Sequence, residues 1–372
     1  FEAVAKTIER LEGSYALGVI CGNEPDKIVA VRKDSPLIVG LGDNEKFIAS
    51  DIPAVLNYTR DIYLLEDKEI VVITKNSAEV FNLNGEKISK EIYKVTWNED
   101  AAEKGGYDSF MLKEIHEQPK AIRDTMTGRV LLNDKVKFED FNLTLEELNE
   151  IDRIYIIACG TAYNAGLMGK VAIEKLAKIP VEVEIASEFR YREPLVTNKT
   201  LIITLSQSGE TADTLAVLRD AKKVGAKTLA VTNVVGSSIS READNVIYTM
   251  AGPEIAVAST KAYTTQVVVM NLLGMYFADL KGILDKDVEK ELKESLLSLP
   301  EKIEAVLEMK SQVAEVSKIL AEETDLFYLG RGADYALVIE GALKVKEISY
   351  VHSEAYAGGE LKHGTIALIE PG

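Results

Sequence analysis

The sequence predicts an α/β protein in which an antiparallel, β-rich domain precedes a doubly wound parallel sheet. Three observations predict this fold class. Up to residue 74, short apolar runs are separated by turn residues, as in antiparallel sheets. From residue 151, apolar runs alternate with longer amphipathic segments, as in parallel strands joined by helices. Residues 326–335 resemble residues 154–163, which indicates a second copy of one α/β unit, cut short.

The β-rich domain is expected to begin with a helix over residues 2–13. Its strand candidates are rich in valine, isoleucine and aromatic residues and lie at 15–20, 27–32, 36–42, 46–50, 61–66 and 69–74. Residues 99–130 are charged and carry a helical piece around 107–118. We therefore expect a domain over 1–98, a boundary near Trp97 and a linker over 99–130.

The following region has the alternating pattern of a doubly wound fold. Strands are predicted at 153–158, 181–185, 200–205, 228–233 and 245–250, and helices at 163–176, 211–224 and 261–280. The charged segment 284–323 has helical periodicity, and residues 352–356 resemble residues 186–190. One complete α/β domain is therefore expected over 131–283. Connecting helices and the first half of a second such domain are expected over 284–372.

Composition limits the partners of the chain. Its 372 residues carry 43 Lys and Arg against 60 Asp and Glu, a net charge of −17, which argues against nucleic acid or an anionic membrane as partner. No apolar run approaches the length of a membrane span, and Phe1 opens no signal-peptide pattern. Cys21 and Cys159 lie far apart, which suggests a reducing compartment. We expect a cytoplasmic protein that holds any anionic ligand locally.

A hydroxyl-rich turn, LSQSGETAD at 205–213, follows a predicted strand and precedes a predicted helix. Parallel sheets bind ligands beyond the carboxyl ends of their strands, where the next helix presents unpaired N–H groups. Ser206, Ser208 and Thr211 can donate hydrogen bonds there, and Gly209 permits close approach to the backbone. Alternatively, Ser208 or Thr211 caps the helix, for about 1 kcal/mol. The density of donors favours an anion site that suits a phosphate.

Two further segments lie at the start of predicted helices. ACGTAYNAG at 158–166 places Thr161 at the same edge of the sheet, and VASTKAYTTQ at 257–266 offers further hydroxyls. Lys261 in the latter can neutralise an anion. Cys159 is expected in the core, because a strand-end cysteine is usually buried. The three turns together predict a polar pocket.

The carboxyl-terminal segment holds further titratable residues. Glu340, Lys344 and Glu347 recur at helical spacing on one face, which a solvated salt-bridge stripe explains, with catalysis as the alternative. His363 lies beside a glycine in ELKHG, where an imidazole can act as acid or base. By pattern alone, a loop histidine is more often incidental.

Several motifs of the chain are long and specific. They are IACGTAYN, EIASEFRYR, TLSQSGETADTLA, VASTKAYTTQ, GRG and EGALKVKEISYVHSEAYAGGELKHG. Together they resemble the isomerase part of the glutamine:fructose-6-phosphate amidotransferase family. Residues 1–98, with GSYAL, SPLIVGLG and FIASD, resemble the second half of that family's Ntn-type glutaminase domain. The resemblance implies doubly wound sugar isomerase (SIS) domains, one complete and one truncated. It also implies an enzyme that converts fructose 6-phosphate and glutamine to glucosamine 6-phosphate and glutamate, with no metal and no organic cofactor.

The resemblance implies roles for single residues. In the family, the hydroxyl-rich turn binds the phosphate of fructose 6-phosphate, and the two further segments approach the sugar. The matching positions in this sequence are Thr161, Ser206, Gln207, Ser208, Thr211, Val257 and Ser259. Similar enzymes often have a serine after the threonine, where this chain has Ala162.

The family's catalytic residues match Glu347, Lys344 and His363. The resemblance therefore favours catalytic roles over a solvated salt-bridge stripe and over an incidental loop histidine. The glutamate moves a proton between C2 and C1 after ammonia has formed an imine at C2, and the lysine assists. A positioned carboxylate suits proton transfer at carbon, and a lysine can stabilise developing enolamine charge. The histidine opens the sugar ring and reaches the neighbouring subunit's site, so a homodimer is expected.

Two parts of the family's machinery are expected to be absent. The nucleophilic cysteine at the mature amino terminus has no match, because residue 1 is Phe, and a Schiff-base lysine lies beyond residue 372 in the family. A chain truncated at both ends, and incomplete as a catalyst, is therefore expected. One alternative is a SIS-fold sugar-phosphate isomerase or deglycase, against which the β-rich domain argues. Another is a sugar-phosphate-sensing module, which needs a basic helix-turn-helix segment that the acidic first hundred residues do not offer.

Overall fold

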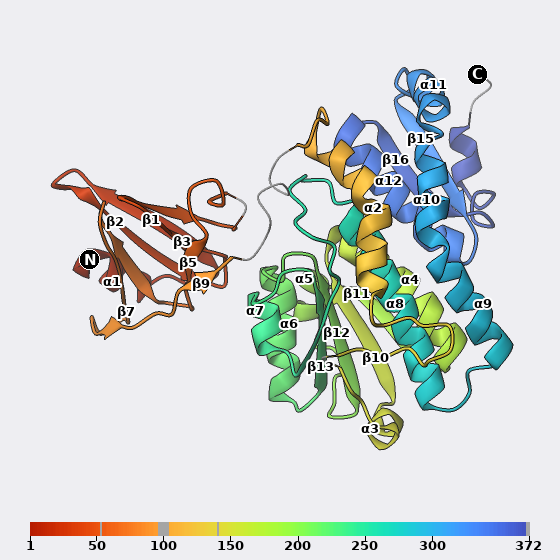
Figure 1. Cartoon of the computed structure of the whole chain (residues 1–372), viewed down its shortest axis with the longest axis horizontal. Coiled ribbons are helices and arrows are strands. Elements are labelled where there is room, and N and C mark those ends of the chain that lie inside the picture. The colour runs from red at the N-terminus through yellow and green to blue at the C-terminus, as the bar shows by residue number, and fades with distance from the viewer. Residues whose placement is uncertain (53, 96–103, 140, 370–372) are drawn as a thin grey trace. The chain divides into compact units, whose positions relative to one another are not determined.

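The computed structural model describes residues 1–52, 54–95, 104–139 and 141–369. The chain divides into two compact units, Phe1–Gly106 and Tyr107–Gly372, which are described separately (Figure 1). The predicted fold class, antiparallel strands before a doubly wound parallel sheet, is confirmed. The predicted boundary near Trp97 lies outside the described residues, and the bounds predicted for the complete and the truncated α/β domains stay a prediction.

The first unit contains one helix and two antiparallel sheets. The strand orders are β1-β2-β6-β7-β8 and β4-β3-β5-β9. The elements are α1 Glu2–Ile8, β1 Tyr15–Cys21, β2 Glu24–Lys33, β3 Ile38–Gly42, β4 Glu45–Ala49, β5 Asp61–Leu64, β6 Ile70–Ile73, β7 Ala78–Phe81, β8 Lys87–Ile88 and β9 Tyr93–Lys94. Strands β1 to β6 match the sequence prediction. Strands β7 to β9 were missed because they are short and lie among polar turns.

Alternation along β2 decides how the layers of this unit pack. Val29 and Val31 face α1, whereas Ala30 lies in the core between the two sheets. At Gly18 of β1 the sheets approach so closely that a Cβ would stand 2.6 Å from Ile48 Cδ1. Glycine at this position therefore permits the contact between the sheets.

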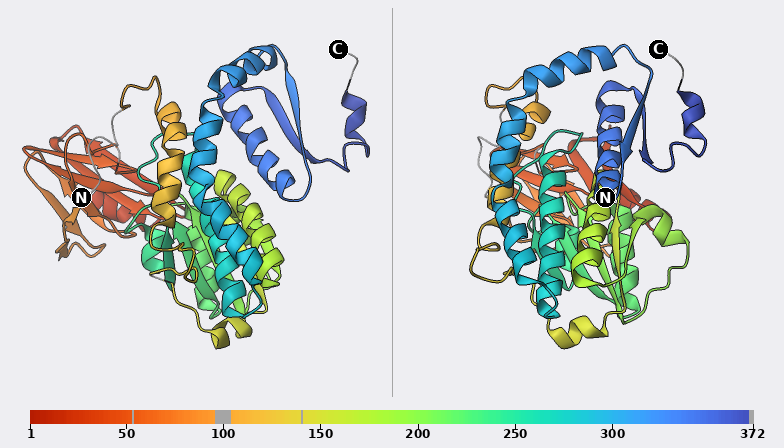
Figure 2. Two further views of the ribbon diagram at one scale, coloured as in Figure 1. Left: turned by 45° about the vertical axis from the view of Figure 1, so that its right-hand side comes forward. Right: turned by 90° about the vertical axis from the view of Figure 1, so that its right-hand side faces the viewer.

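The second unit is built on a five-stranded parallel sheet in the order β11-β10-β12-β13-β14, a doubly wound topology. A separate parallel pair, β15 and β16, is joined by α12 (Figure 2). The elements are α2 Phe110–Met126, α3 Leu145–Glu150, β10 Arg153–Ala158, α4 Gly160–Ala177, β11 Val181–Ile185, α5 Ala186–Tyr191, β12 Thr200–Ser206, α6 Ala212–Lys223, β13 Lys227–Thr232, α7 Ser238–Glu242, β14 Asn245–Tyr248, α8 Lys261–Leu280, α9 Lys286–Leu297, α10 Leu299–Leu307, α11 Lys310–Leu320, β15 Asp325–Gly330, α12 Ala333–Ser349, β16 His352–Ala357 and the 3-10 turn η2 Thr365–Leu368.

Helices cover both faces of the five-stranded sheet (Figure 1). Ile154 and Ile156 of β10 face the core shared with α4 and α8, whereas Tyr155 and Ile157 face α5 and α6. Because all five strands run parallel, their carboxyl ends share one edge of the sheet. The three predicted polar segments follow elements that end at or near this edge. None of the described helices combines the length and the apolar character that crossing a bilayer requires.

Helix α2 is longer than the helical piece predicted from sequence, because it continues through Pro119. Proline has no N–H, so the carbonyl of Ile115 loses its usual helical partner. The side chain of Gln118 donates to this carbonyl instead, with an Nε2 to O distance of 3.0 Å. Ile122 then packs into the core of the parallel sheet. Residues 107–126, which the sequence analysis assigned to the linker, therefore form part of the second unit.

The predicted internal repeat holds for its first half. β15 and the start of α12 correspond to β10 and the start of α4, as the resemblance between residues 326–335 and 154–163 predicts. The second resemblance is wrong, since residues 186–190 lie in helix α5 whereas 352–356 lie in strand β16. The pairing of β16 with β15 makes β11 its structural counterpart. A five-residue match carries too little information to align two segments of the chain.

Candidate functional site

The hydroxyl-rich turn lies between β12 and α6. Ser206 Oγ stands 3.0 Å from Thr211 Oγ1 and accepts a hydrogen bond from the Gly209 N–H, also at 3.0 Å. Ser208 Oγ accepts one from the Glu210 N–H at 3.2 Å. Thr211 is the N-cap residue of α6, yet its side chain makes no capping hydrogen bond to the described residues of this helix. The hydrogen bonds therefore do not support the helix-cap alternative, and the N–H groups that open α6 have no side-chain cap.

Contacts with α7 fix the shape of this turn. Gly209 has a φ of +68°, and a Cβ there would stand 2.1 Å from Ser237 Oγ, so only glycine fits. Its carbonyl accepts a hydrogen bond from the Ile239 N–H at 3.0 Å. The Glu210 carboxylate accepts from both the N–H and the hydroxyl of Ser238, at 2.7 Å each. The carboxylate of Glu210, one of two in the turn, is thereby engaged by α7.

The turn from β10 into α4 forms a second wall. Gly160 has a φ of +54°, and the chain passes through it from Cys159 to Thr161. Cys159 was expected in the core, but it is partly exposed and lines the cavity described below, because the strand ends there. Its sulfur lies 4.0 Å from Thr214 Oγ1.

The irregular loop before α8, residues 251–260, forms a third wall. The Val257 side chain is fully exposed, at 104% of its reference area, and Ser259 Oγ donates to Glu254 at 2.7 Å. Lys261 does not supply the cation that its position in the sequence suggested. It is buried, and its Nζ stands 2.6 Å from Glu117 Oε2, so its charge is already paired.

Helix α12 brings its Glu340, Lys344 and Glu347 face against α4. Lys344 Nζ lies 2.5 Å from Glu347 Oε2 and 3.3 Å from Glu340 Oε1, and it donates to Thr161 Oγ1 at 2.9 Å. Glu340 also accepts hydrogen bonds from Thr161 Oγ1 at 3.0 Å and from Asn164 Nδ2 at 2.7 Å. Burial raises the pKa of Glu340, although these bonds and the charge of Lys344 oppose the shift. A solvated salt-bridge stripe does not describe Glu340 and Lys344, which are mostly buried and bonded to α4, whereas Glu347 is more exposed.

The four segments enclose one cavity of about 270 Å³, near the lower end of the usual range for small-molecule sites. This volume suits a small metabolite better than a dinucleotide. The lining residues are Cys159, Thr161, Ala162, Leu205, Ser206, Gln207, Ser208, Thr211, Val257, Ser259, Gln266 and Glu347. The cavity thus brings together every binding residue predicted from sequence, together with Glu347. Lys344 touches the lining through Thr161 and Glu347.

His363 does not lie with the other predicted residues. It occupies the turn after β16, with an exposed side chain, and its N–H donates to the Glu360 carbonyl at 2.9 Å. It is not among the residues that line the cavity. Its expected action in a neighbouring subunit stays a prediction.

Sequence reasoning missed residues that support the site from behind. Asn164 directs the Glu340 carboxylate, and Glu254 holds Ser259. Asn164 lies one helical turn after Thr161, so its position in the ACGTAYNAG motif was an available signal. Glu254 precedes its motif and gave no such signal. In the described ranges, no three His, Cys, Asp or Glu side chains form a group that could hold a metal ion.

Comparison with known proteins identifies relatives over the whole chain. The SIS domain family matches residues 147–276 and 319–372. The glutamine–fructose-6-phosphate aminotransferase (isomerizing) of Clostridium tetani is 64% identical, over 100% of this chain and 61% of that protein. The protein of the same name from Clostridium perfringens is 62% identical, over 99% of this chain and 60% of that protein. The chain thus spans about three fifths of the length of these curated relatives.

A solved structure supports the same relationship. The C-terminal domain of glucosamine-fructose-6-phosphate aminotransferase from Francisella tularensis is 43% identical, with a TM-score of 0.68. The similarity covers 72% of this chain and 75% of that one.

Proposed function

Since this chain belongs to the glutamine–fructose-6-phosphate aminotransferase family, we propose that its second unit binds fructose 6-phosphate and performs the isomerase chemistry of glucosamine 6-phosphate synthesis. The observation that carries the proposal is the cavity. A turn rich in hydroxyls, two further helix-opening segments and a carboxylate from α12 converge on it from positions far apart in the sequence.

The phosphate is assigned to the turn of Ser206, Gln207, Ser208 and Thr211. Hydroxyls and uncapped N–H groups at the amino end of α6 favour an anion, because the helix dipole is positive there. The carboxylate oxygens of Glu210 are directed at Ser238, and Asp213 accepts a hydrogen bond from the cationic Arg190 at 3.2 Å. This assignment explains why donors in the turn outnumber what a helix cap requires.

The sugar is assigned to the space between Thr161, Val257, Ser259 and Glu347. In this proposal Glu347 moves the proton between C2 and C1, because its carboxylate lines the cavity. Lys344, in contact with it, stabilises the charge that develops on the substrate. Glu340 acts on neither C1 nor C2 of the sugar directly, but it orients Lys344 and Thr161 through its ion pair and hydrogen bond.

The remaining expectations concern the complete enzyme. It takes ammonia from glutamine, works as a homodimer in the cytoplasm, and uses His363 of each subunit in the neighbouring site to open the sugar ring. No metal and no organic cofactor are assigned to the reaction. These statements rest on the family, and the exposed position of His363 leaves its side chain accessible to a second copy.

The proposal is tested by titrating fructose 6-phosphate and fructose into wild type and Ser208→Ala. Removing the Ser208 hydroxyl, a hydrogen-bond donor to a charged ligand, should cost about 1 to 3 kcal/mol of binding free energy, whereas the free energy of unfolding should fall by only about 1 kcal/mol. Fructose, which lacks the phosphate, should bind weakly to both proteins. Calorimetry measures the affinities, and chemical denaturation measures the stability.

Ser298→Ala provides a matched control, because Ser298 lies between α9 and α10 and outside the cavity lining. It should leave the affinity for fructose 6-phosphate unchanged. Equal losses for fructose and fructose 6-phosphate in Ser208→Ala, or no loss for either, would show that the turn serves the helix and not a phosphate.

A further inference from the structure

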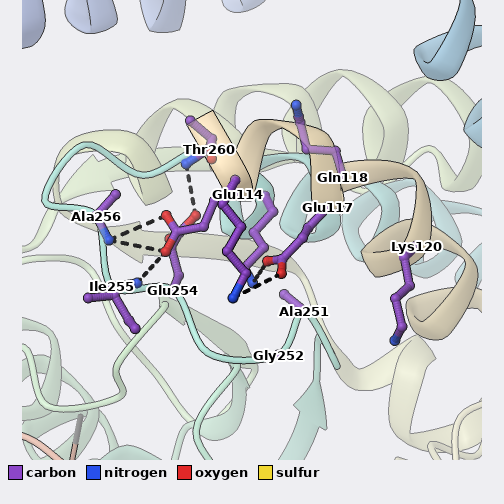
Figure 3. Close-up of polar contacts among 12 residues, drawn as sticks. Glu114, Glu117, Gln118, Lys120, Ala251, Gly252, Glu254, Ile255, Ala256 and Thr260 are labelled. Atoms are coloured by element: carbon purple, nitrogen blue, oxygen red, sulfur yellow. Dashed lines mark hydrogen bonds and ion pairs between the residues drawn. The ribbon is translucent and has the colours of Figure 1, made fainter. Parts of the chain in front are cut away.

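The loop of residues 251–260 supplies Val257 and Ser259 to the cavity, yet it contains no helix or strand. Backbone N–H groups of such a segment need acceptors from elsewhere. At the end of the loop, the Glu254 carboxylate accepts from the Thr260 N–H at 2.8 Å and the Ala262 N–H at 3.1 Å. Glu254 thereby caps α8 and closes the loop on that side (Figure 3).

The beginning of the loop is held by Asn233, which follows β13. Its Oδ1 accepts from the Ala251 N–H at 2.8 Å, and its Nδ2 donates to the Gly252 carbonyl at 2.7 Å. Both ends of the loop are therefore fixed to the parallel-sheet domain.

The middle of the loop is held by a residue of α2. Glu114 accepts hydrogen bonds from the N–H groups of Ile255, at 2.6 Å, and Ala256, at 3.2 Å (Figure 3). These two residues directly precede Val257, and Glu114 lies 141 positions before Ile255 in the sequence. Glu114 itself is only 2% exposed and does not line the cavity.

The charges around Glu114 favour a rigid arrangement. Glu117, one turn further along α2, pairs with Lys261 at 2.6 Å and with Lys113 at 3.7 Å. Burial and the nearby Glu254 raise the pKa of Glu114, whereas the two N–H donors and Lys261 oppose this shift. Hydrogen bonds to a carboxylate are stronger and more directional than those to a neutral acceptor.

We infer that Glu114 is a positioning residue for sugar recognition, which fixes the backbone of Ile255 and Ala256 so that Val257 and Ser259 meet the sugar. The inference rests on the proposed function, because it assumes that the cavity receives a sugar phosphate. It assigns Glu114 no contact with the substrate. Its effect passes through the loop, and it should concern the sugar and not the phosphate, which is assigned to a different turn.

The test compares Glu114→Gln with wild type for binding of fructose 6-phosphate and of inorganic phosphate. The amide keeps the size of the side chain but replaces one acceptor by a donor that faces two N–H groups. We expect the affinity for fructose 6-phosphate to fall by about 10-fold, the usual scale for one buried hydrogen bond. The affinity for inorganic phosphate, measured by competition, should change by less than about 2-fold.

Two further variants sharpen the result. Asp124→Asn removes a carboxylate from the same helix, but from an exposed side chain that pairs with Lys120, and it should alter neither affinity. Glu114→Asp retains the charge with a shorter reach, so it should restore part of the lost affinity and serves where Glu114→Gln does not fold. Hydrogen exchange of residues 251–260 should quicken in Glu114→Gln while exchange in β12 and α6 is unchanged.

The outcomes separate this inference from the proposed function. A wild type that binds neither ligand overturns the proposed function and, with it, the sugar-recognition role. A wild type that binds both, with unchanged affinity and unchanged loop exchange in Glu114→Gln, overturns only the inference. Equal losses for fructose 6-phosphate and inorganic phosphate would indicate a general structural effect and would also overturn it.

Discussion

Two glutamates on one face of α12 differ in burial, and this difference separates their roles. Glu340 is 5% exposed and has its carboxylate engaged by Thr161, Asn164 and Lys344. The side chain of Glu347 is 38% exposed and reaches the cavity, with Lys344 as its ionic partner. A carboxylate with all its acceptors engaged is poorly suited to receive a proton from substrate, whereas Glu347 has acceptor capacity that faces the cavity.

Replacing Glu347 by Gln should remove the base while keeping the size of the side chain. In an enzyme of full family length that carries these residues, turnover should fall by about 10² to 10⁴ while substrate binding changes little. Steady-state kinetics with fructose 6-phosphate and glutamine measures both quantities. Turnover within about three-fold of wild type would return Glu347 to the role of a salt-bridge partner.

At the scale of elements, the helices that open at the cavity begin in two different ways. Helices α4 and α6 start at Cys159 and Thr211 without a side-chain cap, so their first N–H groups are available to a ligand. Helix α8 starts at Thr260, and Glu254 accepts hydrogen bonds from its N–H groups. The anion is expected at α6, because only that uncapped helix is preceded by a turn with several hydroxyls in the cavity lining, while α8 contributes the shape of the preceding loop. Helix α12 completes the site by packing on α4 through Glu340.

The contact between α12 and α4 should depend on pH through Glu340. Its pKa is raised in the folded chain, so the folded state binds this proton more tightly than the unfolded state does. The contribution of Glu340 to the free energy of unfolding is thus largest below its ordinary pKa of 4.5 and declines as pH rises through the raised value. In the Glu340→Gln variant the side chain at this position does not titrate, so the variant serves as the reference.

Denaturation of wild type and Glu340→Gln at a series of pH values that starts near the ordinary pKa of 4.5 and rises from there measures this effect. The stability of wild type minus that of the variant should decrease as the pH rises. A difference that grows with pH would mean that the hydrogen bonds to Glu340 outweigh its burial.

At the scale of the whole molecule, each unit has a hydrophobic core of its own. The first unit packs α1 and two sheets around Val31 and Val39, and the second packs helices on both faces of the parallel sheet. The cavity is lined only by residues of the second unit. A ligand of the cavity should therefore stabilise that unit alone.

Thermal unfolding with and without fructose 6-phosphate tests this separation. At a concentration about 100 times Kd, the ligand should add about 2.7 kcal/mol to the stability of the second unit and raise its midpoint by about 5 to 10 °C. Calorimetry should show one shifted and one unshifted transition, and the shift should shrink in Ser208→Ala. A single transition, or equal shifts of two, would show that the units unfold together.

The sequence by itself determined the fold class, and it predicted residues that the structure places in the lining of the cavity. The continuous apolar run that contains Ile154, Tyr155 and Ile156 is a local property of the strand, and it predicts a strand buried on both faces before any packing is known. Ser206 and Ser208 likewise lie in a turn from a parallel strand to a helix, which predicts that their hydroxyls lie at the ligand-binding edge of the sheet. Regular spacing and specific motifs are both properties of the amino-acid sequence, so they can be recognised without the structure.

Only the tertiary structure decided which groups are free to act. Lys261 has the sequence signature of an anion-binding lysine, but packing of α2 beside α8 pairs it with Glu117. Cys159 has the signature of a core residue, but the strand ends at the cavity. Glu114 meets Ile255 across 141 positions, a distance at which no sequence period operates. Pairing between residues of different elements depends on how those elements pack. The spacing of residues within one element does not predict such contacts.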